Sequence, residues 1–410
     1  MKLLVLSNGH GEDVIAIRII ERLLEDSELE ITALPIVGQG YAYQKLDIPL
    51  AGRVQQMPSG GFIYKGGAPL WQDLKGGLIS LTLEQIKLVR QWRKNGGKIL
   101  AVGDIVPLLY AWISKADYAF VGTAKSEYYL RDEFGWLPQT FWLEKKFNSV
   151  YLPWERWLMK RAPEGYAERN RCQAVFPRDS LTTKVLHEYK IPAYDLGNPM
   201  MDGLIGKNKP KDPYRLDVLL LPGSRMPEAI RNWQQILTGV WSVIKALPQK
   251  KLDFNAAIAS GIDLKPFIIN AVTQGWHVTD RQEQTVVLVQ NHRTLTLSKE
   301  YNQKFFQEAD VALAMAGTAT EQFVGLGKPV VIFPGEGPQF TPAFAEAQSR
   351  LLGCSILMVE NPCQAGGAIA KIIDDEEQLN TIAANGQRRM GESGAAKRIA
   401  ACLYQTLLAK

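Results

Sequence analysis

Short apolar runs alternate with helical patterns along the N-terminal half of the chain. Residues 2–7 (KLLVLS) form an apolar run typical of a buried strand, and residues 12–26 carry apolar side chains at helical spacing. A glycine-containing turn, NGHG, joins the two. Further strands are predicted at residues 31–37, 98–102, 118–121 and 173–176. A strand, a glycine turn and a helix, followed by more strands, predict a Rossmann-like domain with a parallel sheet.

A second alternation begins after residues 203–215, a polar segment rich in lysine, proline and glycine that we interpret as a linker. A helix is predicted at residues 228–247, and strands at residues 216–221, 253–259, 286–289, 311–314, 330–333 and 355–359. We therefore expect an α/β fold of two Rossmann-like domains that face each other across a cleft. The expected parts are an N-terminal domain (1–200), a C-terminal domain (201–385) and a C-terminal helix (386–410) that packs back on the N-terminal domain.

The composition is that of a globular protein. Hydrophobic residues make up 46% of the 410 residues and charged residues 22%, and the length suits two domains. The net charge of +5 fits an anionic ligand or membrane surface without requiring nucleic acid. The longest apolar stretch, residues 99–113, is interrupted by Asp104 and Pro107 and is too short to span a bilayer. With no signal-peptide pattern, we expect a cytoplasmic protein, soluble or peripheral on the inner face of a membrane.

Residues 309–335 carry the strongest chemical signal. They read as a strand, the turn Ala316-Gly317-Thr318, a helix and a second strand. Gly317 lets the backbone turn closely, so the helix beginning near Thr318 presents free N–H groups that favour a phosphate. Glu321, one turn into the helix, is placed to accept hydrogen bonds from a ribose diol. The alternative is an ordinary strand–helix–strand unit in which Thr318 caps the helix and Glu321 favours its positive end.

Two further loops follow predicted strands of the same half. In the segment PGSR, Gly223 permits close approach, Ser224 can donate a hydrogen bond and Arg225 offers a planar fork suited to a diphosphate. In residues 334–342, Gln339 is placed to hydrogen-bond sugar hydroxyls. The alternatives are a solvated turn and a solvated loop. Because ligands bind at the carboxyl ends of parallel strands, the three loops together predict an anionic-ligand site.

Three segments resemble lipid-A-disaccharide synthase and, more broadly, the two-Rossmann-domain glycosyltransferases of the GT-B type. They are LLPGSR, GNPMMDGL (residues 197–204) and AGTATEQFVGLGKPVV. The match is strong in the C-terminal half and thin in the N-terminal half. The resemblance implies a UDP-sugar donor held by the C-terminal domain, with Gly317 and Thr318 near the diphosphate and Glu321 near the ribose, and an acceptor held by the N-terminal domain. The first loop departs from the synthase pattern, and its histidine is more similar to transferases that glycosylate lipid I or diacylglycerol.

Sugar transfer needs a base for the acceptor hydroxyl and donors that stabilise the departing diphosphate. Two residues are candidates for the base, His10 in the first glycine loop and Asp104 after the strand at residues 98–102. A third arrangement uses both, with His10 as base and Asp104 as its orienting partner. The alternatives are that His10 orders its loop and that Asp104 caps a helix. Glu127 is a weaker third candidate, expected on a helix surface. Arg225 and the helix start can stabilise the diphosphate without a metal, so no metal or other cofactor is expected.

The N-terminal half holds seven of the ten tryptophans. Residues 141–161 mix aromatic and basic side chains, with Trp154 and Trp157 at helical spacing. Such a mixture suits the headgroup region of an anionic membrane, and a glycine-rich segment with Phe62 and Tyr64 is expected to join this acceptor or membrane surface. The alternative is that the tryptophans pack in the core. Single-stranded nucleic acid would suit the same mixture, but no RNA-binding motif is present and we expect no nucleic-acid partner.

Together these signals predict a metal-independent glycosyltransferase that moves a sugar from a UDP-sugar to a lipid-linked or amphipathic acceptor. A UDP-sugar epimerase of the same fold is the first alternative. It would bind the same donor but carry more carboxylates for elimination and proton return. A non-catalytic nucleotide-sugar-binding protein is the second alternative, and it would bind the donor without turnover.

Overall fold

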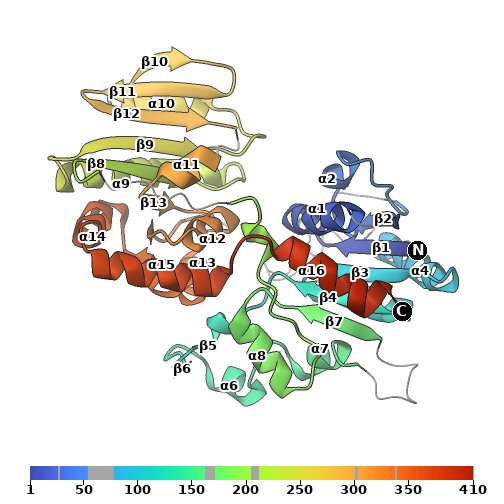
Figure 1. The fold of residues 1–410 in the computed structure, drawn as a ribbon. Coiled ribbons are helices and arrows are strands. Elements are labelled where there is room, and N and C mark those ends of the chain that lie inside the picture. The colour runs from blue at the N-terminus through green and yellow to red at the C-terminus, as the bar shows by residue number, and fades with distance from the viewer. Residues whose placement is uncertain are drawn as a thin grey trace. The chain divides into compact units, whose positions relative to one another are not determined.

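The computed structural model describes residues 1–25, 28–53, 78–161, 171–204, 212–300, 303–337 and 339–409, with only the backbone described for His10, Leu78 and Ile79. The chain divides into two compact units. The N-terminal unit comprises residues 1–202 and 392–410, and the C-terminal unit comprises residues 203–391. Each unit is built around its own sheet with flanking helices (Figure 1). The predicted α/β fold of two Rossmann-like domains is confirmed.

The N-terminal unit contains five parallel strands in the order β2-β1-β3-β4-β7. These strands are β1 (Lys2–Ser7), β2 (Glu30–Pro35), β3 (Lys98–Gly103), β4 (Tyr118–Gly122) and β7 (Cys172–Phe176), and a small hairpin adds β5 (Arg131–Asp132) and β6 (Gly135–Trp136). The helices are α1 (His10–Glu25), α2 (Tyr41–Gln44), α4 (Leu78–Lys94), α5 (Ile105–Ser114), α6 (Trp142–Phe147), α7 (Pro153–Leu158), α8 (Ser180–Glu188) and α16 (Ala395–Leu403). The shorter helical turns are η1 (Glu127–Tyr129), η2 (Pro199–Met201) and η5 (Tyr404–Leu408).

The central strand β1 is apolar on both faces because helices cover both sides of this sheet. Leu3 and Val5 belong to the core on the α1 side. Leu4 and Leu6 belong to the core on the opposite side, which includes residues of α4 and α5. Successive side chains of a strand point to opposite faces, so a near-continuous apolar run is the expected pattern for a parallel sheet between two helical layers.

The C-terminal unit contains eight strands in the order β10-β11-β12-β9-β8-β13-β14-β15. They are β8 (Arg215–Leu221), β9 (Lys251–Ala257), β10 (His277–Arg281), β11 (Thr285–Gln290), β12 (Arg293–Ser298), β13 (Val311–Ala314), β14 (Val330–Ile332) and β15 (Ile356–Met358). The helices are α9 (Glu228–Ala246), α10 (Lys265–Thr273), α11 (Gln303–Glu308), α12 (Thr318–Gly325), α13 (Pro342–Leu352), α14 (Ala365–Ile372) and α15 (Glu376–Met390), with turns η3 (Gly353–Ser355) and η4 (Pro362–Gln364).

Two strands of this sheet, β10 and β12, were not predicted from the sequence. All five side chains of β10 are exposed, and polar residues interrupt β12 at alternate positions. Neither strand therefore carries the continuous apolar run that marks the buried parallel strands. Together with β11 they form an antiparallel extension at one edge of the sheet.

The last segment of the chain belongs to the N-terminal unit. Helix α16, drawn in red, lies beside α1, drawn in blue (Figure 1), and its residues Ile399 and Leu403 are fully buried in the core on that side. The chain returns at residues 391–392 rather than at the expected 385–386. The difference arises because α15 continues to Met390 and packs against α12 in the C-terminal unit.

Asp202, in the segment GNPMMDGL, joins the two places where the chain crosses between the units. Its Oδ1 accepts hydrogen bonds from the amides of Gly394 and Ala395, at 2.7 and 2.8 Å, and its Oδ2 accepts one from the amide of Ala396 at 2.7 Å. These amides open α16 and have no partner inside the helix. The carboxylate therefore caps α16 and holds the returning chain against residues just before the crossing.

We expect Asp202→Ala to lower the free energy of unfolding by about 1–2 kcal/mol, because removing a helix cap usually costs this much. Urea unfolding followed by circular dichroism would measure the change. Glu21→Ala, on the exposed side of α1, is the control and should have little effect. Equal unfolding midpoints for the two variants would contradict the capping role.

Candidate functional site

Three loops of the C-terminal unit meet at one edge of its sheet. Strands β8, β13 and β14 are neighbours and run parallel, so the loops that follow them begin side by side. All of the predicted donor-binding residues lie on these loops or in the first turn of α12, namely Gly223, Ser224, Arg225, Gly317, Thr318, Glu321 and Gln339. The side chains of Ser224, Arg225 and Thr318 are exposed, whereas Glu321 is half-buried.

The start of α12 is not capped by a side chain among the described residues. Gly317 occupies the N-cap position, so the alternative in which Thr318 caps the helix is wrong. The nearby polar side chains donate to carbonyl groups instead: the Thr320 hydroxyl to the Ala316 oxygen at 2.7 Å, and the Gln348 amide to the same oxygen at 3.1 Å. These contacts leave the first amides of the helix available to an anion.

Asn232 of α9 connects the loops that follow β8 and β13. Its Nδ2 donates to the carbonyl oxygens of Pro222 at 3.0 Å and Met315 at 3.4 Å. Between these loops, Gly223 has a φ of +94°, and a Cβ atom there would lie 3.1 Å from the Met315 oxygen. A side chain at this position would therefore combine backbone strain with a close contact, which explains the need for glycine.

Glu228, at the start of the same helix, holds the loop that follows β14. The side chain is buried, and its Oε1 accepts hydrogen bonds from the amides of Gln339 at 3.1 Å and Phe340 at 2.7 Å. A Cβ atom on Gly337 would lie 2.2 Å from this carboxylate. Glu228 and Asn232 lie one turn apart on α9, so one helix fixes all three loops, and neither residue was singled out from the sequence.

Lys328, in the segment GLGKP, caps the carboxyl end of α11 and does not face the edge of the sheet where the three loops meet. Its Nζ donates to the carbonyl oxygens of Phe306, Gln307 and Ala309, at 2.9, 2.7 and 2.6 Å. These carbonyls lie at the carboxyl end of α11, where a cation is favoured by the helix dipole. The positive charge of Lys328 therefore stabilises the end of α11.

The N-terminal unit places Asp104 beside its first loop. Asp104 is the N-cap of α5, and its Oδ1 accepts hydrogen bonds from the Val106 amide at 2.8 Å and from Asn8 Nδ2 at 3.1 Å. Burial raises the pKa of Asp104, and these two hydrogen bonds oppose the rise. The alternative role of Asp104 as a helix cap is confirmed. Because His10 begins α1 but its side chain lies outside the description, the pairing of His10 with Asp104 stays a prediction.

Glu12 is a further carboxylate at this edge that the sequence analysis did not single out. It is half-buried, and a Cβ atom on Gly103 would lie 3.2 Å from Glu12 Cγ. Burial raises the pKa of Glu12 to about 7, a hydrogen bond to its own backbone opposes the rise, and the charges of Asp104 and Asp13 add to it. A carboxyl group with such a pKa can both accept and release a proton near neutrality.

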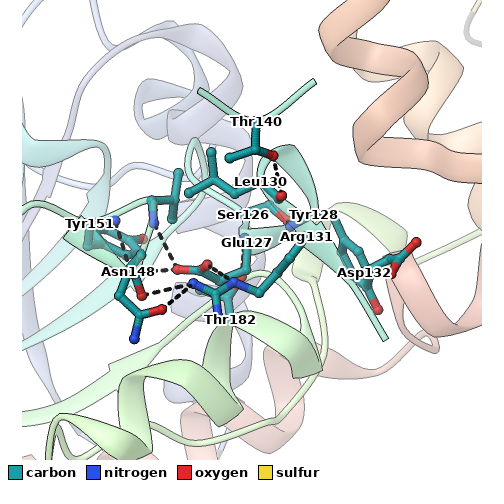
Figure 2. Close-up of polar contacts among 12 residues, drawn as sticks. Ser126, Glu127, Tyr128, Leu130, Arg131, Asp132, Thr140, Asn148, Tyr151 and Thr182 are labelled. Atoms are coloured by element: carbon teal, nitrogen blue, oxygen red, sulfur yellow. Dashed lines mark hydrogen bonds and ion pairs between the residues drawn. The ribbon is translucent and has the colours of Figure 1, made fainter. Parts of the chain in front are cut away.

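Glu127 is enclosed by polar partners, as Figure 2 shows, and is not on a helix surface as expected. Its Oε1 accepts hydrogen bonds from the Ser149 hydroxyl at 2.5 Å and the Val150 amide at 2.8 Å, and Arg131 Nε lies 3.1 Å from its Oε2. Burial raises its pKa. Since the side chain is fully buried, Glu127 anchors the segment between β4 and β7 and is not accessible to a substrate.

The two tryptophans of α7 are exposed. Trp154 is 50% exposed and Trp157 is 44% exposed, so the alternative that both pack in the core is wrong. Phe62 and Tyr64, assigned to the same surface, lie outside the described residues. None of the helices in the described ranges has the length and apolar character needed to cross a bilayer.

Comparison with known proteins identifies the fold. No family model and no curated protein sequence matches the chain. Among solved structures, UDP-GlcNAc 2-epimerase from Neisseria meningitidis, bound to UDP-GlcNAc, is 15% identical, with 99% of this chain and 100% of that chain covered and a TM-score of 0.53. MurG from Acinetobacter baumannii is 12% identical over 98% and 99% of the two chains, with a TM-score of 0.54. A glycosyltransferase of kitacinnamycin is 12% identical over 99% and 98%, also with a TM-score of 0.54.

At these identities the likeness establishes the fold. The chain has the GT-B fold of two Rossmann-like domains, which UDP-sugar epimerases and glycosyltransferases share. UDP-N-acetylglucosamine 2-epimerases recur among the matches. The resemblance to lipid-A-disaccharide synthase continues to rest on the three sequence segments alone.

We expect Glu12→Gln to be more stable than the wild type at pH 8 but not at pH 5. The pKa of Glu12 is about 7 in the folded chain against an ordinary value of 4.5. Between these values the folded state binds more protons than the unfolded state, so wild-type stability falls as the pH rises through this window. Glutamine does not titrate, and the variant escapes this loss.

Thermal unfolding at pH 5, 6, 7 and 8 would measure the effect as a melting-temperature difference that grows with pH. Glu21→Gln, exposed on the same helix, should show no such trend. A difference for Glu12→Gln that is constant across this range would contradict the raised pKa.

Proposed function

We propose that the protein binds a UDP-sugar through its C-terminal unit and breaks the bond between the sugar and the diphosphate. The uncapped start of α12 carries this proposal. Its first amides, beside Gly317 and the exposed Thr318, suit a diphosphate because they combine free N–H donors with the positive end of the helix dipole. Arg225, exposed on the neighbouring loop, supplies a forked cation for the same oxygens.

The other predicted residues of this edge fit the remaining parts of a nucleotide sugar. Glu321 is proposed to accept hydrogen bonds from the ribose diol, and Gln339 to hydrogen-bond the sugar hydroxyls. Gly223 lets the backbone approach closely, and Ser224 adds a donor. When the bond between C1 and the diphosphate oxygen breaks, the electron pair goes to that oxygen. The amides of α12 and Arg225 would stabilise the charge without a metal.

Proton transfer is proposed to involve His10, Asp104 and Glu12 of the N-terminal unit. In glycosyl transfer, the acceptor hydroxyl attacks C1 and its proton passes to one of these groups. In epimerisation, the proton is taken from the sugar carbon next to C1 as the bond between C1 and the diphosphate oxygen breaks, which leaves a double bond between the two carbons. A proton then returns to that carbon on the opposite face while the diphosphate oxygen re-forms its bond to C1. Glu12, with a pKa of about 7, suits either task because it exchanges protons near neutrality.

Epimerisation of a UDP-sugar is the first specific reaction that we propose. It is favoured by the recurrence of UDP-N-acetylglucosamine 2-epimerases among the matching structures. The carboxylates of Glu12 and Asp104, whose charges interact, are proposed to supply the acidic groups that this reaction needs.

Glycosyl transfer to a lipid-linked or amphipathic acceptor is the second candidate. The similarity of LLPGSR and GTATE to lipid-A-disaccharide synthase favours it, and so do the exposed Trp154 and Trp157. MurG and the glycosyltransferase of kitacinnamycin support it among the matching structures.

We expect Glu321→Ala to weaken UDP binding by about 1–3 kcal/mol, because it leaves two ribose hydroxyls without their acceptor. Isothermal titration calorimetry with UDP would measure the loss. Glu376→Ala is the matched control, since Glu376 is an exposed acidic residue in the first turn of another helix of this unit. An affinity unchanged by Glu321→Ala would remove Glu321 from the site.

Incubation with radiolabelled UDP-sugars, with and without a membrane lipid extract, distinguishes the candidates. We expect an altered sugar without added lipid, and loss of this activity in Glu12→Gln. Release of UDP that depends on lipid would instead support transfer. Binding without either change would support a non-catalytic nucleotide-sugar-binding protein, and failure to bind UDP would contradict the proposal as a whole.

A further inference from the structure

A basic cavity of about 330 Å³ lies in the N-terminal unit, at the edge of the sheet where β4 and β7 begin. Its lining includes the cations Arg90, Lys115 and Arg171 and the aromatic residues Trp112 and Tyr118. They come from α4, α5 and the segments that lead into the two strands. Elements that are far apart in the sequence therefore place three positive charges around one cavity.

This cavity is separate from the proposed UDP-sugar chemistry. Tyr118 begins β4 and Arg171 directly precedes β7, so the cavity lies at the amino edge of the parallel sheet. Asn8 and Asp104 follow the carboxyl ends of β1 and β3. Since β4 contains five residues and a strand rises about 3.3 Å per residue, roughly 16 Å of sheet separates the two edges.

The positive charges that line the cavity outnumber the carboxylates paired with them in the described ranges. Asp117 is the carboxylate paired there, 3.5 Å from Arg171 Nη1. The Nε atom of Arg171 is buried and has no hydrogen-bond partner among the described residues. Arg90 and Lys115 line the cavity and are exposed. An anion in the cavity would reduce the repulsion among the cations.

The aromatic wall of the cavity continues onto the exposed face of α7. Trp112 contacts Trp157 edge to face, with ring centroids 5.5 Å apart. The Tyr118 hydroxyl donates to the Leu158 carbonyl at 2.5 Å, which holds the end of α7 at this place. Trp154, 50% exposed on the same helix, adds a second ring. Indole rings favour the boundary between lipid headgroups and hydrocarbon.

We propose that this cavity binds the phosphate of an anionic phospholipid headgroup while Trp154 and Trp157 rest in the membrane interface. The volume is near the lower end of the range for ligand pockets, about 300–1,000 Å³, and suits a headgroup rather than a whole nucleotide sugar. Free phosphate would satisfy the cations, but it would give the adjacent exposed tryptophans no partner. The assignment does not depend on UDP-sugar binding, because the cavity residues and the two tryptophans are distinct from the proposed donor-binding and proton-transfer residues.

Vesicle flotation tests this assignment. Wild-type protein should bind vesicles of phosphatidylcholine with phosphatidylglycerol at least tenfold more tightly than vesicles of phosphatidylcholine alone, and added salt should weaken the binding. The double variant Arg90→Gln/Lys115→Gln should lose most of this preference. Both residues are exposed, so the fold should be retained, and an unchanged affinity for UDP would verify this.

A matched control removes two charges elsewhere on the same unit. Lys45→Gln/Lys184→Gln changes two exposed cations that do not line the cavity, and it should keep the vesicle preference. An equal loss in both double variants would overturn the proposal, because it would show only a general effect of net charge. Trp154→Ala should also weaken vesicle binding while leaving UDP affinity unchanged, and full vesicle binding by this variant would count against the interfacial role.

Two further arms test the source of the anion. Inorganic phosphate at millimolar concentration should not displace the protein from vesicles, and a short single-stranded oligonucleotide should not bind the cavity. Displacement by phosphate would assign the cavity to a free anion. Oligonucleotide binding that disappears in Arg90→Gln/Lys115→Gln would assign it to nucleic acid. Either result would overturn the lipid assignment.

Discussion

A helix needs acceptors for its first amides, and the way α12 meets this need shapes the C-terminal unit. In the described residues, the neighbouring polar side chains Thr320 and Gln348 donate to carbonyl oxygens and do not accept from the amides. Gly317 at the N-cap has no side chain to contribute. These contacts leave the first amides of α12 available to solvent or a ligand. A diphosphate is well matched to them because it brings several acceptor oxygens and the charge that the helix dipole favours.

The geometry around these amides depends on α9. Asn232 fixes the loops after β8 and β13, and Glu228 fixes the loop after β14. Glycines at positions 223 and 337 let the loops approach these two side chains and each other. One helix thus sets the relation of three segments that are distant in the sequence. Such a preorganised edge avoids part of the ordering cost that a mobile loop incurs when it binds.

The sequence was informative where local patterns decide the structure. The apolar run at residues 2–7 predicted β1 with the bounds that the structure has, and the glycine and helix signals located Gly317 and Gly223. Local patterns do not show which distant groups meet. The contact between Glu228 and Phe340 spans 112 residues, and the raised pKa of Glu12 depends on burial and on Asp104. The surface assignment of Glu127 was wrong for the same reason, since its partners near residue 150 lie more than twenty positions away.

The return of residues 392–410 to the N-terminal unit has a consequence for synthesis on the ribosome. Helix α16 covers α1 and buries Ile399 and Leu403 among side chains that include Leu3 and Val5. Until this segment emerges, that face of the first sheet exposes apolar side chains to solvent. The C-terminal unit can complete its fold before residues 392–410 are synthesised, because it consists of the continuous segment 203–391. The half translated first is therefore the half completed last, an exception to the usual order in which domains mature from the N-terminus.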